Sequence, residues 1–227
     1  QACSYLEKKD IKSFFKDARV VEINDGIDFN EFQNSEKFSK TDLFNKFSEI
    51  KSSFVSDLFF SMGRLHKIKR FDVIIDSFFL YLKENPNAKL IIAGNNDGDQ
   101  DDLLVKINEL GLTDDALLIG EIGLKDKCIL LSNASVFLLA SDFESFGIVI
   151  IEALASGTPV IVSNKTPWKD INKNKCGIFT DNNSISFYEA MDELKNQDFN
   201  TSVIKSYALK KFDIKIIANK FIELLAE

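Results

Sequence analysis

The segment from residue 135 to residue 162 reads SVFLLASDFESFGIVIIEALASGTPVIV and contains a strand, a loop, a helix and a second strand. Its first apolar run, Ser135–Ala140, is continuous rather than alternating, which is typical of a strand covered on both faces. A helical pattern follows at Phe146–Ser156, and a second apolar run lies at Pro159–Val162. This order predicts a parallel βαβ unit.

The same alternation extends over most of the chain. Further apolar runs predict buried strands at Leu58–Met62, Lys89–Ala93, Ala116–Ile119 and Gly177–Thr180. Helical patterns lie between most strands, at Phe71–Glu84, Asp101–Leu110, Lys125–Leu131 and, as a short one, Trp168–Asn172. Three more helical patterns follow without strands, at Ser184–Lys195, Thr201–Phe212 and Ile214–Ala226. The predicted fold class is therefore α/β: a doubly wound parallel sheet of about six strands with helices on both faces and a helical tail.

The first 56 residues are less regular. A helical pattern covers residues 3–16, a short β-like run follows at Ala18–Ile23, and Asn24-Asp25-Gly26 reads as a turn. Residues 27–56 are polar and are interpreted as a connecting stretch with one short helix near Asp42–Lys51. Because the first residue is Gln1 rather than Met, we expect the chain to start partway through a longer protein.

Composition excludes several classes of protein. The 227 residues are 45% hydrophobic, which excludes a disordered chain. With 28 basic and 35 acidic residues the net charge is −7, so nucleic acid is not an expected partner. Three dispersed cysteines, Cys3, Cys128 and Cys176, do not form a disulfide or zinc framework and indicate a reducing cytoplasm. No apolar run reaches 18 residues, so no transmembrane segment is expected.

The helix that starts near Phe146 is the first candidate binding element. In doubly wound sheets ligands bind at the carboxyl ends of the strands, where strand order reverses. A helix start there offers free N–H groups to an anion, and Gly147 would let a phosphate approach closely. Glu144 precedes the helix and Glu152 lies on it. Taken alone, Glu144 could serve only the helix dipole, and Glu152 could be a surface charge or a buried residue paired with the backbone.

The loop after the first strand of the sheet is the second candidate element. It reads GRLHKIKRFD from Gly63 to Asp72. Arg64 and Lys69 could together neutralise a diphosphate, although basic residues near helix starts are usually solvated. His66 is the only histidine and is interpreted as a solvated loop residue rather than a general base.

The acidic stretch Asp97–Asp102 is not interpreted as a metal site. An EF-hand loop starting at Asp97 would need glycine at its sixth position and glutamate at its twelfth, and the chain has Asp102 and Asn108 there. A capped helix start is the favoured interpretation.

Together these segments resemble the GT-B glycosyltransferases of family 4, the glycosyl transferases group 1. The resemblance covers about Asn24 to Thr180. It rests on Gly63 with a lysine six residues later, on the strand ends Ala93-Gly94 and Ile119-Gly120, and on a Glu-x7-Glu block followed by Ala155, Gly157, Pro159 and Val160. The block runs from Glu144 to Glu152 and is the most specific of these motifs.

The resemblance implies a pair of Rossmann-like domains with the active site between them. Residues 1–28 would be a remnant of the amino-terminal acceptor domain and the linker, because Asn24–Asp28 resembles the turn that closes that domain. Residues 29–227 would be the carboxyl-terminal domain that binds the nucleotide-sugar donor. The last helix of the family crosses back to the first domain, and Ile214–Ala226 would be that helix or would pack locally.

The resemblance also assigns roles to individual residues. Catalysis is assigned to Glu144, which would orient the transferred sugar, and to Arg64 and Lys69, which would hold the diphosphate and stabilise the leaving nucleotide. Glu152 would accept the ribose hydroxyls. Further donor-nucleotide contacts are expected from Gly63, Phe146, Gly147, Ile148, Gly120 and Ile122. Two cations can replace a divalent ion at the diphosphate, so neither a metal nor a cofactor is expected.

This sequence departs from the family pattern at several points. Arg70 and Ser145 stand where glycines are usual, and the loop Lys165–Asp170 lacks a frequent glutamate, although its Pro-Trp pair resembles some envelope-polysaccharide members. The histidine of the acceptor domain has no counterpart, since His66 is not in its place.

The function implied is a retaining hexosyl- or glycosyltransferase of cell-envelope polysaccharide or lipopolysaccharide synthesis, of which this chain is the donor-binding half, inactive alone. Its partners would be a UDP- or GDP-sugar and a saccharide or lipid-linked acceptor held by the other domain. A cytoplasmic location is expected. For the full-length protein, a position at the inner face of the membrane stays open. Two alternatives stay open: a non-catalytic nucleotide-sugar-binding module and a GT-B sugar-nucleotide epimerase.

Overall fold

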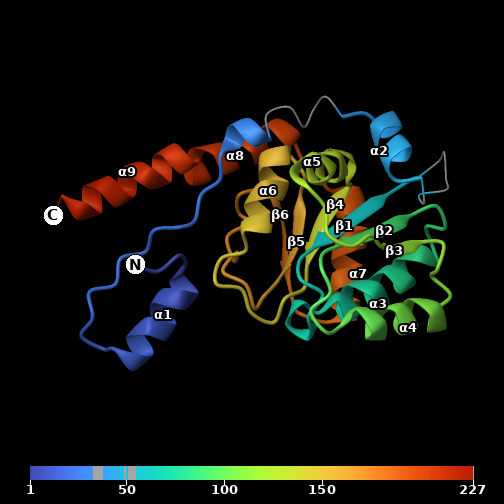
Figure 1. The fold of residues 1–227 in the computed structure, drawn as a ribbon, viewed down its shortest axis with the longest axis horizontal. Helices are drawn as coiled ribbons and strands as arrows, with labels where there is room; N and C mark the ends of the chain where they lie inside the picture. The colour runs from blue at the N-terminus through green and yellow to red at the C-terminus, as the bar shows by residue number, and fades with distance from the viewer. Residues whose placement is uncertain (33–37, 49, 51–54, 227) are drawn as a thin grey trace.

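The computed structural model describes residues 1–32, 38–48, 50 and 55–226. At its centre is a six-stranded parallel sheet in the order β3-β2-β1-β4-β5-β6 (Figure 1). The strands are β1 (Leu58–Met62), β2 (Lys89–Ala93), β3 (Ala116–Leu118), β4 (Val136–Leu139), β5 (Val160–Ser163) and β6 (Gly177–Thr180). The predicted α/β class and the number of strands are confirmed.

The order of the strands fixes where a ligand site can form. The chain enters the sheet at β1, moves outward through β2 and β3, and returns to β4 on the other side of β1. The carboxyl ends of β1 and β4 therefore lie side by side at the point where strand order reverses. The loops that leave these ends are residues 63–70 and 140–147, the two segments singled out in the sequence.

Helices cover both faces of the sheet, because successive strand residues point to opposite sides. In β1, Phe59 packs with the helices of one face and Phe60 with those of the other. The first face carries α3 (Phe71–Leu82), α4 (Gln100–Glu109) and α7 (Ser184–Glu193). The second carries α2 (Lys40–Lys46), α5 (Leu124–Asn133), α6 (Ile148–Ser156) and α8 (Thr201–Phe212).

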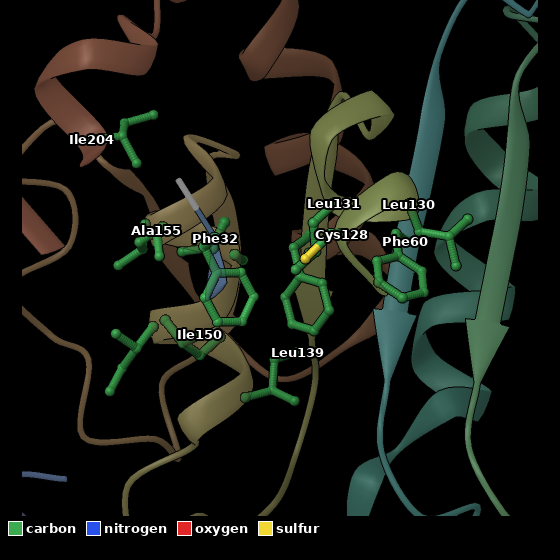
Figure 2. Close-up of a cluster of buried hydrophobic side chains, with 14 of the residues drawn as sticks. Phe32, Phe60, Cys128, Leu130, Leu131, Leu139, Ile150, Ala155 and Ile204 are labelled. Atoms are coloured by element: carbon green, nitrogen blue, oxygen red, sulfur yellow. The ribbon is translucent and has the colours of Figure 1, made fainter. Parts of the chain in front are cut away.

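The second face holds α6, the helix that begins at the candidate site. Figure 2 shows its Ile150 beside Leu139 of β4, with Phe32 from the amino-terminal segment in the same cluster. Each such buried side chain contributes about 1.5–3 kcal/mol relative to exposure. This packing fixes α6 against the sheet and so fixes the position of its first residues.

The two ends of the chain lie beside the sheet rather than in it (Figure 1). α1 (Tyr5–Phe14) buries none of its residues, and α9 (Ile214–Leu225) buries only Ile217 while extending away from the sheet. The segment that follows α1 is attached to the domain where α8 meets α9. There the Ile27 amide donates to the carbonyl of Phe212 at 3.0 Å. The described residues also form the short helices η1 (Phe29–Glu31), η3 (Lys67–Lys69) and η4 (Leu194–Asn196).

Several predicted elements differ from the structure. Ala18–Ile23 does not form a strand: it takes part in an isolated bridge between Ala2 and Glu22 and joins no sheet of the described residues. Trp168–Asn172 forms turns instead of a helix. The helix predicted at Asp42–Lys51 is α2, which starts earlier, at a Ser39 capping box, and ends at Lys46; residues 49 and 51 lie outside the described part.

Among the described residues, no helix is both long and apolar enough to cross a lipid bilayer.

Candidate functional site at the carboxyl ends of β1 and β4

A cleft of about 440 Å³ opens at the carboxyl ends of β1 and β4. The structure brings together in its walls seven of the residues predicted for the site: Gly63, Arg64, Lys69, Glu144, Phe146, Gly147 and Ile148. The first three follow β1 and the other four follow β4. The three other predicted residues, Gly120, Ile122 and Glu152, do not line this cleft.

Lys69 and Glu144 form an ion pair in the cleft. The Lys69 Nζ lies 2.5 Å from Glu144 Oε1, and the two side chains are only 18% and 12% exposed. The Ser141 hydroxyl donates to the same carboxylate oxygen at 2.7 Å. Sequence reasoning did not foresee this pair, because its members are 75 residues apart and were assigned separate roles. An ammonium carries three N–H donors, so Lys69 keeps two for an anion.

The loop that carries Lys69 is fixed from several directions. His66 begins the turn η3, and its Nδ1 accepts from the Ile68 amide at 3.1 Å, which gives this exposed histidine a local capping role. The Asp142 amide donates to the Ile68 carbonyl at 2.8 Å and ties the β1 loop to the β4 loop. Arg70 adopts a left-handed conformation (φ 52°) and lies 3.3 Å from the carboxylate of Asp142.

Arg64 lies at the open side of the cleft. Its Nη1 is 2.5 Å from Asp97 Oδ2, and its side chain is 63% exposed. Such an exposed pair contributes little to stability and can exchange for a stronger anion. The guanidinium can therefore turn toward a ligand in the cleft at low cost.

The start of α6 presents unbonded amides to the same cleft. Gly147 precedes the helix with a left-handed backbone (φ 88°), a conformation that favours glycine. Within the described part of the chain, the amides of Gly147, Ile148 and Val149 donate no hydrogen bond. Orphan donors of this kind at a helix start, together with the helix dipole, favour an anion. The helix begins at Ile148, two residues later than predicted, which leaves Phe146 in the loop.

Trp168 contacts Phe146, which lies in the loop just before this helix start. Its Nε1 donates to the Phe146 carbonyl at 2.7 Å, and its ring packs against Phe146 and Phe212. The residue is 5% exposed and does not line the cleft. Trp168, part of the Pro-Trp pair noted in the sequence, therefore holds Phe146 in place before α6, a contact that the sequence motif does not predict.

Glu152, about one turn after the first residue of α6, forms a second buried ion pair and does not line the cleft. Its Oε1 lies 2.6 Å from the Nζ of Lys127, at the start of α5. Burial raises the pKa of the Glu152 carboxyl, and Lys127 opposes that rise. The surface-charge interpretation of Glu152 is wrong, since the side chain is only 12% exposed. Lys127 was missed, because a lone lysine in a helical pattern usually faces solvent.

Gly120 and Ile122 belong to the loop between β3 and α5. The Gly120 carbonyl accepts from the Gly94 amide at 2.8 Å, which joins the ends of β2 and β3. Ile122 packs on the same hydrophobic cluster as α5 and α6. Both therefore lie on the ligand edge of the sheet, on the side that carries Lys127.

The acidic stretch Asp97–Asp102 disperses its charges. Asp97 pairs with Arg64 and Asp102 with Lys67. Asp99 precedes α4 without a side-chain capping bond; Asn96 instead accepts from the Gly98 amide at 2.9 Å. In the described ranges no three His, Cys, Asp or Glu side chains gather as a metal site would require.

Asp25 is a cleft residue that sequence reasoning did not identify. It belongs to the amino-terminal turn, yet it lines the same cleft as Lys69 and Glu144. Burial raises the pKa of its carboxyl, and Glu7 adds to the rise. No local motif could have revealed this position, because it depends on how the amino-terminal segment crosses the domain.

Comparison with known proteins identifies the family and the fold of the chain. The family model for glycosyl transferases group 1 matches residues 46–211. Mannosylfructose-phosphate synthase of Agrobacterium fabrum is 30% identical over 145 residues, which is 61% of this chain and 31% of that protein. This chain therefore spans about a third of the length of that curated relative.

Two solved structures share the fold. A glycosyltransferase from Rickettsia africae aligns with a TM-score of 0.85 at 19% identity, over 98% of this chain and 61% of the other. Anabaena Alr3699/HepE, solved in complex with UDP and glucose, aligns with a TM-score of 0.79 at 21% identity, over 99% of this chain and 62% of the other. At these identities the likeness concerns the fold.

Proposed function

Because the chain belongs to the glycosyl transferases group 1 family, we propose that it forms the donor-binding domain of a retaining, GT-B glycosyltransferase of family 4. The donor is a nucleotide-diphosphate sugar. The observation that carries the proposal is the cleft itself, where two cations, unbonded helix amides and a carboxylate face one volume. A diphosphate needs the first two features, and a sugar hydroxyl needs the third.

The cations and the helix start receive the diphosphate. Arg64 leaves its exposed pair with Asp97, and Lys69 uses the N–H donors that Glu144 does not take. The amides of Gly147 and Ile148 add hydrogen bonds that strengthen as charge develops on the leaving phosphate. This set supplies positive charge without a metal ion, so the proposal includes neither a metal nor a cofactor.

The two glutamates divide the rest of the donor. Glu144 lies in the cleft beside Lys69 and accepts hydroxyls of the transferred sugar. Glu152 lies outside the cleft lining, paired with Lys127 of α5, and accepts the hydroxyls of the ribose. Gly63 and Phe146 complete the cleft wall, while Gly120 and Ile122 border the nucleotide through backbone atoms.

The acceptor side of the reaction belongs to another domain in this proposal. Residues 29–227 form the donor domain, and residues 1–28 are the end of the acceptor domain and the linker. The acceptor is a saccharide or lipid-linked saccharide of the cell envelope, and the reaction takes place on the cytoplasmic side. Alone, the chain binds donor but transfers no sugar, because one wall of the cleft leaves water at the reacting atoms.

Calorimetric titration with UDP and GDP tests the proposal. Binding is expected with a chelator present, and it should weaken as salt rises because the cations are partly exposed. Arg64→Ala and Lys69→Met should each weaken it about tenfold or more, the loss expected for one hydrogen bond to a charged group. Lys67→Ala is the matched control, because Lys67 lies in the same turn but pairs outward with Asp102.

Two outcomes would refute the proposal. If the chain binds neither UDP nor GDP, the donor-domain assignment is refuted. If a chelator abolishes the binding, the metal-free account is refuted. The epimerase alternative is separated by incubating the full-length protein with donor alone, since conversion without an acceptor is expected only of an epimerase. Transfer to a sugar acceptor by the full-length protein excludes the non-catalytic module.

A further inference from the structure

Lys127 and Glu152 meet across two helices in a nearly dry environment. The Nζ of Lys127 lies 2.6 Å from Glu152 Oε1, and the side chains are 20% and 12% exposed. On α6, Glu152 stands next to Ile151 and two positions from Ile150 and Leu154, which are all fully buried. A carboxylate in such surroundings is costly unless a cation compensates it. Lys127 is that cation.

The second oxygen of the same carboxylate has no partner in the part of the chain that the structure describes. Glu152 Oε2 is buried and accepts no hydrogen bond from any described residue. Buried polar atoms are rarely left unpaired, and an unpaired charged oxygen is the most costly kind. Lys127 likewise spends one N–H donor on Glu152 and keeps others. A free acceptor and a free donor thus lie side by side, which suits a vicinal diol.

The charges that face Glu152 come from two directions. Lys127, from α5, favours the ionised carboxylate, while Glu31, from η1, opposes it. Burial opposes ionisation more strongly than either, and it raises the pKa of the carboxyl. Lys127 is therefore the group that keeps an otherwise unfavourable charge at this position.

We propose that Lys127 is a positioning residue of the nucleotide site, which holds the Glu152 carboxylate ionised and orients its Oε2 toward the ribose diol. This inference rests on the proposed function, because it takes the ribose as the ligand of Glu152. It adds a residue that no motif indicates. It also predicts a preference for ribose over 2′-deoxyribose. A donor on Lys127 and an acceptor on Glu152 would together bind two neighbouring hydroxyls, and 2′-deoxyribose lacks one of them.

The proposal predicts how affinity depends on pH. The ionised carboxylate accepts hydrogen bonds from the hydroxyls, so affinity falls as the pH drops through the pKa of Glu152. Removing Lys127 raises that pKa further, because only burial and Glu31 then act on the carboxyl. The loss of affinity therefore begins at a higher pH in Lys127→Met than in the wild type.

The experiment is calorimetric titration of UDP and GDP between about pH 5.5 and 8.5. Lys127→Met should weaken binding about tenfold at neutral pH, with a larger ratio to wild type at the acidic end. Lys127→Arg keeps the charge and should restore most of the affinity and the wild-type pH profile. Lys125→Met is the matched control, because it removes an exposed lysine from the same helix turn and should change neither.

A second titration tests the specificity. Wild-type protein should bind UDP more tightly than 2′-deoxy-UDP, and Lys127→Met should reduce that preference. A variant that has merely lost structure would bind both nucleotides worse by the same factor. Thermal unfolding of each variant, including the neutral pair Lys127→Met with Glu152→Gln, identifies such a loss.

The outcomes separate this inference from the proposed function. If the wild type binds neither UDP nor GDP, the proposed function fails. If the wild type binds and Lys127→Met matches it in affinity, pH profile and preference for ribose, the role of Lys127 is overturned and the donor site stands. NMR titration of the Glu152 carboxyl needs no nucleotide: an unchanged pKa in Lys127→Met overturns the inference directly.

Discussion

Neutralising one member of the Lys69–Glu144 pair should destabilise the domain, and neutralising both should restore most of the loss. The substitutions are Lys69→Met, Glu144→Gln and their combination, which keep side-chain size approximately constant. Each single variant leaves one charge without its partner at a position where 18% or less of the side chain reaches solvent. The double variant leaves no charge at all.

The expected magnitude follows from this burial. Exposed ion pairs contribute about 0–1 kcal/mol, whereas breaking a fully buried pair costs about 3–5 kcal/mol. At 2.5 Å and 12–18% exposure the pair is closer to the second case. We expect each single variant to lose about 2 kcal/mol, which for a chain of this length lowers the melting temperature by about 4–8 °C. Because the double variant should lose less than about 1 kcal/mol, the coupling energy of the cycle should be about 3 kcal/mol.

Urea unfolding of the four proteins measures this coupling. The control is a cycle on Lys195 and Asp192, a pair of similar distance (2.7 Å) whose side chains are 35% and 45% exposed. Its coupling should stay below about 0.5 kcal/mol, as for other exposed helix pairs. Equal coupling in the two cycles, or a double variant as unstable as the sum of the singles, would refute the reasoning.

Three further predictions concern other contacts. Gly147→Ala should cost about 1–2 kcal/mol in thermal unfolding through its left-handed backbone alone, because the added carbon would lie 3.6 Å from its nearest neighbour. Ser156→Ala should leave the free energy of unfolding unchanged or raise it by up to about 1–2 kcal/mol, because the buried Ser156 hydroxyl has no partner among the described residues. Ser61→Ala should lower it by about 1 kcal/mol, because it loses the 2.8 Å hydrogen bond to the Leu138 carbonyl. The opposite order of stability in urea unfolding would contradict this. Burial raises the pKa of Cys176 to about 11 and that of Cys3 to about 12, so both thiols stay protonated at pH 8. Iodoacetamide should therefore alkylate them slowly at pH 8 and faster as the pH rises toward 10. Rapid alkylation at pH 8 would contradict this prediction.

The sheet was predictable because its strands are encoded locally. Leu58–Met62, Lys89–Ala93 and Gly177–Thr180 have the bounds that were predicted, since each is a short, mostly apolar run between turn residues. Ala18–Ile23 has a comparable composition but no strand beside it, and a strand needs a partner that composition does not reveal. Trp168–Asn172 forms turns where a helix was predicted, and its indole is anchored on Phe146 by a long-range contact that the local pattern does not encode.

The members of the cleft were predictable, but their pairing was not. Motif spacing identified Lys69 and Glu144 because both follow strands that end at the same edge. Their ion pair, and that of Lys127 with Glu152, depend on how helices pack at separations of 75 and 25 residues. Asp25 entered the cleft through the path of the amino-terminal segment, which no local pattern encodes.

The attachment of Ile27 to the end of α8 connects the amino-terminal segment to the candidate site. The Phe212 carbonyl that accepts from Ile27 belongs to the residue whose ring packs on Trp168 and Phe146. Three aromatic rings in contact form a stiff strut from the amino-terminal segment to the start of α6. A displacement of the amino-terminal segment should therefore be transmitted through these packed rings to the unbonded amides at the start of α6, with no ligand contact at the point where the segment moves.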